Sequence, residues 1–106
     1  MTGHPVSFRL SATAYDAIMH EAVSRGDNST LSLESREALS TAAPLSDGVW
    51  VVDCTDEVSH DIEDWFAMVA VVESATPKGA AGRFGMLNSA VRAIQDGRAE
   101  SRHEDN

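Results

Sequence analysis

Acidic side chains and one histidine recur at helical spacing between residues 57 and 64. Glu57, His60, Asp61 and Asp64 are three or four residues apart, so on a helix they would share one patch of surface. Oxygen and imidazole groups in such a patch are suitable ligands for a divalent cation. One helix face seldom completes a coordination shell, and no second cluster in the sequence has complementary spacing. We therefore predict a solvated acidic face without a metal, and Glu57, Asp61 and Asp64 as candidates for a protein contact.

Cys54 is the second candidate for chemistry, because it lies where a predicted strand passes into a predicted helix. A helix N-terminus can lower the pKa of a thiol and so produce a nucleophile. Here Asp53, Asp56 and Glu57 surround the cysteine, and their negative charge opposes thiolate formation. A phosphatase pattern would also need an arginine at position 60, which is a histidine. We expect a buried, inert cysteine, no catalytic residue, no cofactor and no enzymatic activity.

On a helix predicted over 56–74, the acidic residues at 56–64 would all lie on one side. Apolar residues form one broad stripe, and Ser59 lies with the acids on the opposite side. The residues predicted to anchor this stripe in a core or an interface are Trp65, Phe66 and Val69. Beyond Trp65 the helix is apolar nearly all round, which is typical of a domain centre and also of a dimer contact. The sequence leaves these two alternatives open.

Two strands are predicted from their hydrophobic patterns. Val6, Phe8 and Leu10 alternate with polar residues, as in a half-buried strand. The run at 49–53 is rich in β-formers and predicts a strand buried on both faces. Residues 30–33 begin either a strand or a helix. A shift by 43 residues aligns the apolar patterns of the two halves, but they share little identity, so internal duplication is the less favoured interpretation.

The predicted class is α+β: a helix-rich single domain of order β-α-α-β-α-α, with a small two- or three-stranded sheet covered by helices. Pro44 is expected to stop the second helix and Gly97 the last one, with a loop at 76–82. The predicted helices cover about 11–26, 33–43, 56–74 and 83–96, the globular domain 6–96, a flexible lead 1–5 and a disordered tail 97–106.

The charge distribution limits the choice of partner. The net charge is −9, and residues 1–73 carry three arginines against thirteen acids, which argues against general affinity for nucleic acid or anionic membrane. The last helix is more basic, and Arg83 and Arg92 are its candidate contact residues. The longest apolar run, 65–72, is much shorter than the ~20 residues of a membrane helix. We expect a cytoplasmic protein without membrane contact.

One segment carries a family resemblance. VSFRLSATAYDAIMHEAVSRGDNSTLSLESREAL, residues 6–39, resembles the start of a ribbon-helix-helix DNA-binding regulator or antitoxin. In that family a short strand pairs with its dimer mate in the major groove, and the second helix's N-terminus holds a phosphate. The resemblance implies that Ser7 and Arg9 face bases and that the backbone at 30–33 meets phosphate.

The sequence favours a small, acidic, non-catalytic interaction or regulatory module. Its partner is expected to be another protein, which the sequence does not identify, and we expect the module to form a homodimer. The alternative is a dimeric regulator of the ribbon-helix-helix type that binds DNA.

Overall fold

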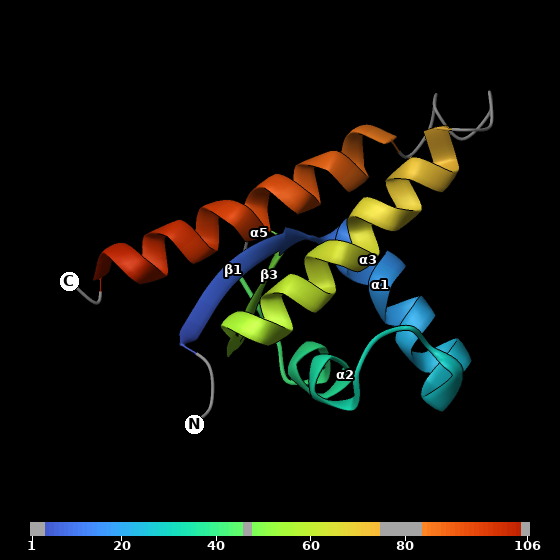
Figure 1. Ribbon diagram of the computed structural model, residues 1–106, viewed down its shortest axis with the longest axis horizontal. Coiled ribbons are helices and arrows are strands. Elements are labelled where there is room, and N and C mark those ends of the chain that lie inside the picture. The colour runs from blue at the N-terminus through green and yellow to red at the C-terminus, as the bar shows by residue number, and fades with distance from the viewer. Residues whose placement is uncertain (1–3, 46–47, 75–83, 105–106) are drawn as a thin grey trace.

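The computed structural model describes residues 4–45, 48–74 and 84–104. Within these residues the fold is α+β and rich in helix, as predicted (Figure 1). The elements are β1 (Pro5–Ser11), α1 (Ala12–Arg25), the 3₁₀ turn η1 (Gly26–Asn28), α2 (Leu33–Ser40), β2 (Ala43–Pro44), β3 (Val49–Thr55), α3 (Asp56–Ser74) and α5 (Phe84–Glu104).

The sheet is antiparallel, with strand order β1-β3-β2. β1 and β3 pair along their whole length, with Phe8 opposite Val52. The inward side chains of β1 are buried, whereas Arg9 and Asp53 are exposed on the outer face of the sheet. The predicted burial of β3 on both faces was therefore wrong, because Asp53 is exposed and Val51 only half-buried on the outer face.

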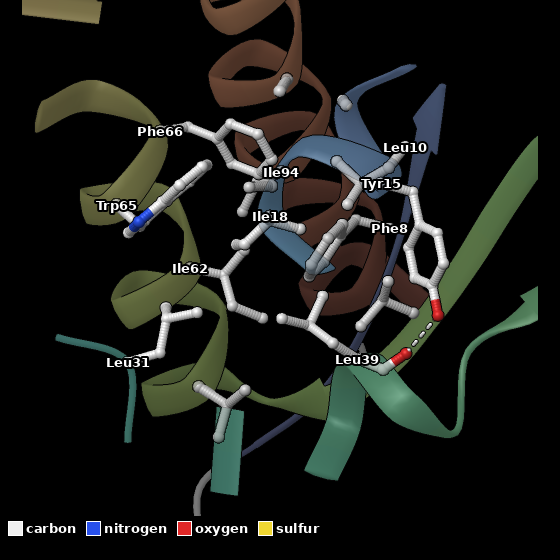
Figure 2. Close-up of a cluster of buried hydrophobic side chains, with 14 of the residues drawn as sticks. Phe8, Leu10, Tyr15, Ile18, Leu31, Leu39, Ile62, Trp65, Phe66 and Ile94 are labelled. Carbon is white, nitrogen blue, oxygen red and sulfur yellow. Dashed lines mark hydrogen bonds between the residues drawn. The ribbon is translucent and has the colours of Figure 1, made fainter. Parts of the chain in front are cut away.

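The core lies between the inner face of the sheet and the helices (Figure 2). Side chains of β1, α1, α2, α3 and α5 meet there, and Phe66, Ile18 and Leu39 are completely buried. The ring of Tyr15 stacks on Trp50 at 4.1 Å between centroids, and its hydroxyl donates a 2.7 Å hydrogen bond to the carbonyl of Leu39. This bond satisfies the one polar atom that Tyr15 brings into an apolar setting.

Two strand-helix units repeat within the chain. β1 and β3 have the same length and start 44 residues apart, and each is followed at once by a helix whose first turn is capped by Ser11 or Thr55. Buried positions repeat at the same interval: Ala14, Tyr15, Ile18 and Ala22 in α1 correspond to Val58, Ser59, Ile62 and Phe66 in α3. The two halves therefore repeat the same order of strand, cap and helix, and their strands pair antiparallel.

The structure shows how residues 30–44 fold, where the sequence left a strand or a helix open at 30–33. Ser32 is its N-cap and accepts a hydrogen bond from the Ser35 N–H, so helix α2 begins at Leu33. The helix ends at Ser40, before the predicted position 43, because Ala43 and Pro44 pair with β3 as the edge strand β2. An edge strand is where a sheet tolerates proline, which lacks the N–H of other residues.

The last helix does not end at Gly97. Helix α5 continues to Glu104 and rests on β1 at this glycine: an added Cβ would lie 2.5 Å from the Phe8 Cβ and 2.6 Å from the Ser7 carbonyl oxygen. Ser101, one turn later, accepts a 3.2 Å hydrogen bond from the Ser7 N–H. The predicted tail was therefore wrong over 97–104, because packing on β1 overrides the usual role of glycine as a helix stop.

The predicted lead was also too long. Pro5 belongs to β1, and the His4 carbonyl accepts a 2.7 Å hydrogen bond from the Asp56 N–H. Residues 1–3 and 105–106, the rest of the predicted lead and tail, lie outside the described residues, as does the predicted loop at 76–82.

Candidate functional site

The acidic face of α3 separates into exposed and engaged side chains. Glu57 and Asp64 are exposed and remain candidates for a contact with another molecule. His60 lies beside two carboxylates of its own helix, 3.5 Å from Asp56 Oδ2 and 3.9 Å from Glu63 Oε1. Within the described ranges no group of three or more His, Cys, Asp or Glu side chains is arranged to hold a metal ion.

Asp61 binds within the chain and does not face solvent freely. Its Oδ2 accepts a 2.6 Å hydrogen bond from the buried Ser35 hydroxyl and a 3.0 Å bond from the Ser32 N–H. A carboxylate at this point satisfies a donor of the first turn of α2 and interacts favourably with the helix dipole. Asp61 thus has partners within its own chain, because α2 packs against α3 and uses its charge, and its role as an intermolecular contact stays a prediction.

An ion pair and hydrogen bonds connect α5 to α3. The guanidinium of Arg98 is mostly buried; its Nη2 pairs with Glu63 Oε1, and its Nη1 donates a 3.4 Å hydrogen bond to Ser59 Oγ. Gln95 Nε2 donates a 2.8 Å bond to the other oxygen of Glu63. Ser59 was expected on the wet side of the helix but is fully buried, because α5 covers this side of α3.

Cys54 is half-buried at the end of β3. Burial raises the pKa of its thiol to about 12, and the neighbouring charges of Asp53 and Asp56 act in the same direction, while Arg98 partly opposes them. The thiol is therefore protonated at neutral pH and is a poor nucleophile.

Two of the three predicted apolar anchors lie in the core. Phe66 is completely buried and Trp65 is 6% exposed, with their rings edge to face at 5.0 Å. Val69 is half-buried and packs against the core. The side of α3 that carries Trp65, Phe66 and Ala70 is therefore part of the domain core, so beyond Trp65 the first alternative holds for this side of the helix.

The C-terminal half of α3 has a different environment. It runs beside α5 in the opposite direction, and both extend beyond the sheet (Figure 1). Met68, Val71 and Val72 are 47%, 69% and 62% exposed and lie within one turn of the same helix. We call these three residues the α3 strip. Sequence periodicity indicated an apolar end of the helix but did not show which side the core leaves uncovered.

Of the two basic residues predicted as contact residues, the structure describes only Arg92. Arg92 is exposed on α5, as expected for a contact residue. Arg83 lies outside the described residues. Arg98, which the sequence did not single out, is buried in the ion pair with Glu63.

A groove runs between β1 and the C-terminal half of α5. It encloses about 550 Å³ and is lined by Ser7, Phe8, Arg9, Val51, Ala93, Asp96, Gly97, Glu100 and Ser101. We call it the β1–α5 groove. The sequence did not predict it, because its walls are about 90 residues apart in the chain and the predicted tail left α5 too short to form one of them.

The residues to which the ribbon-helix-helix resemblance assigns DNA contacts are partly exposed and partly close to acidic side chains. Ser7 and Arg9 are exposed on the outer face of the antiparallel sheet, but β1 pairs with β3 of its own chain. Asp53 is opposite Ser7 in this pairing. At the start of α2, where the resemblance implies a phosphate, the Asp61 carboxylate accepts the Ser32 N–H bond.

None of the described helices combines the length and the apolar character needed to cross a membrane. Comparison with protein-family models, with curated proteins and with solved structures found no match.

Proposed function

We propose that the protein is a small acidic, non-catalytic interaction or regulatory module that docks on other protein chains and forms a homodimer. The observation that carries this proposal is the exposure of Met68, Val71 and Val72 on α3. The domain is small, so apolar area is scarce, and three large apolar side chains grouped on one helix are typical of a protein contact.

The protonated state of Cys54 supports a role without covalent chemistry. A thiol with a pKa of about 12 contributes almost no thiolate at neutral pH. His60 is flanked by Asp56 and Glu63, neither of which is a nucleophile that a histidine base would activate.

The α3 strip favours a second copy as one occupant. In a twofold dimer the same patch lies on both sides of the interface, so an uncharged apolar strip packs on itself without an unpaired charge. The net charge of −9 makes two chains repel each other, and salt screens this repulsion. We therefore expect the dimer to become tighter as the salt concentration rises.

Cysteine cross-linking tests this arrangement. In a Cys54→Ala background, Val71→Cys should form an interchain disulfide under mild oxidation, because position 71 is central in the strip. Val23→Cys is the control: Val23 is 75% exposed, and it lies near the end of α1, far from the end of α3 in Figure 1. Equal cross-linking at both positions, or none at position 71, would count against docking through the strip.

A dimeric regulator that binds DNA is the second candidate, favoured by the outward position of Ser7 and Arg9 on the antiparallel β1–β3 pair. Phosphate contacts need several cations, and this face brings Asp53, Asp96 and Glu100 near Arg9. A mobility shift with fragments from around the protein's own gene tests it. A sequence-selective complex that Arg9→Ala abolishes would establish this candidate in place of the first.

A further inference from the structure

We propose that the β1–α5 groove binds an extended basic segment of a partner protein. This inference deepens the proposed interaction function and rests on it, but it uses a surface distinct from the α3 strip. The groove lies along β1 and the C-terminal half of α5, whereas the strip lies near the end of α3.

The shape of the groove suits a narrow, extended chain. Gly97 allows α5 to touch the backbone of β1 at Ser7 and Phe8, so the helix lies directly along one side of the groove. Ala93, one turn earlier on the same helix, has a small side chain that leaves space above Arg9 and Val51. A volume of about 550 Å³ is in the range that ligand sites commonly have.

The backbone of β1 offers hydrogen-bonding groups to this space. The His4 carbonyl and the Ala12 N–H both bond to the β3 side, so even-numbered residues of β1 face β3. Odd-numbered residues therefore face the opposite edge, where the Ser7 N–H donates to Ser101 Oγ. The N–H of Arg9 follows on the same edge and faces the groove. An extended segment can accept from it, as in other complexes where a peptide lies along a strand edge.

The charges of the groove select a basic occupant. Asp96 and Glu100 are exposed, lie one helical turn apart on α5 and line the wall opposite Arg9. A lysine or arginine side chain would pair with these two carboxylates, and a backbone carbonyl or carboxylate of the same segment would meet the Arg9 guanidinium. The net charge of −9 also attracts a cationic segment from a distance.

Titration with a blocked pentapeptide of alternating valine and lysine, followed by the amide NMR signals of the protein, tests this inference. We expect saturable shifts centred on Ser7, Arg9, Gly97 and Ser101, and none with the same peptide carrying glutamate in place of lysine. Asp96→Asn with Glu100→Gln should weaken binding by roughly tenfold or more, since both carboxylate partners of the lysine are lost.

The matched control removes the same charge elsewhere. Glu57→Gln with Asp64→Asn neutralises two exposed acids of α3. The affinity for the lysine peptide should change by less than about threefold, because these acids attract the peptide only from a distance and salt screens that attraction. Equal losses in the two double variants, shifts centred on α3, or no shifts at all would overturn the inference. Val71→Glu separates it from the proposed dimer: the groove should still bind the peptide when the strip no longer associates.

Discussion

At the scale of single residues, Asp61 shows how a side chain can look available in sequence and yet be engaged. Its spacing on α3 is that of Glu57 and Asp64, and only the fold brings Ser32 and Ser35 against it. The partners lie 26 to 29 residues away, beyond any helical period. Local patterning therefore predicted which acids lie on one helix but not which of them the chain itself binds.

Asp61→Ala should destabilise the protein by about 1 to 3 kcal/mol, because the buried Ser35 hydroxyl loses its charged acceptor and the Ser32 N–H its partner. Asp64→Ala removes the same charge from an exposed position of the same helix and should change stability by no more than about 0.5 kcal/mol. Urea denaturation monitored by tryptophan fluorescence measures both. Similar midpoints for the two variants would contradict the role assigned to Asp61.

Cys54 gives a prediction for pH dependence. Because burial and nearby acids raise the pKa of the thiol to about 12, the folded protein should react slowly with a disulfide reagent at pH 8, and the urea-unfolded chain much faster. The unfolded thiol ionises above its ordinary pKa of 9.0 while the folded one stays protonated, so this group lowers stability as the pH rises from 9 towards 12. Equal labelling rates of the folded and unfolded protein would contradict a protonated, shielded thiol.

At the scale of elements, most strands and helices follow from local pattern. Alternation predicted β1, and the apolar stripe identified Trp65 and Phe66 as anchors, which the structure places in the core. The errors arose where distant segments decide. Gly97 has the residue type of a helix stop, but it is the point at which α5 lies against β1. β2 has only two residues, Ala43 and Pro44, and exists because β3 is beside it.

Gly97→Ala tests the contact between α5 and β1. The added methyl would meet backbone and Cβ atoms of β1 within 2.5 to 2.9 Å, so we expect a loss of about 1 to 3 kcal/mol in stability despite alanine's higher helix propensity. Gly85→Ala is the control on the same helix, because nothing lies within 4 Å of its added Cβ, and stability should rise by up to about 1 kcal/mol.

Thermal unfolding of the two variants provides the comparison. A Gly97→Ala variant as stable as Gly85→Ala would mean that α5 does not pack closely on β1. Because these segments also form the walls of the β1–α5 groove, such a result would remove the structural basis of that site.

At the scale of the whole molecule, β1 pairs along its whole length with β3 of the same chain, inside a three-stranded sheet. Because this pairing occupies one edge of β1, the homodimer that we propose would form through another surface. Among the described residues the α3 strip groups three exposed apolar side chains on one helix, while Val23 and Leu33 lie singly on α1 and α2 and Leu45 follows β2. In the proposed dimer, the net charge of −9 on each chain would make association depend on salt.

Sedimentation velocity at tens of micromolar protein, in low and moderate salt, tests the central claim most directly. We predict a mass of two chains for wild type, favoured by added salt, and a mass of one chain for Val71→Glu, which places a charge in the middle of the strip. Val23→Glu adds the same charge at a more exposed valine on α1 and should still sediment as a dimer. A wild-type protein that sediments as a single chain under all these conditions, or a Val71→Glu variant that remains a dimer, would contradict association through the α3 strip.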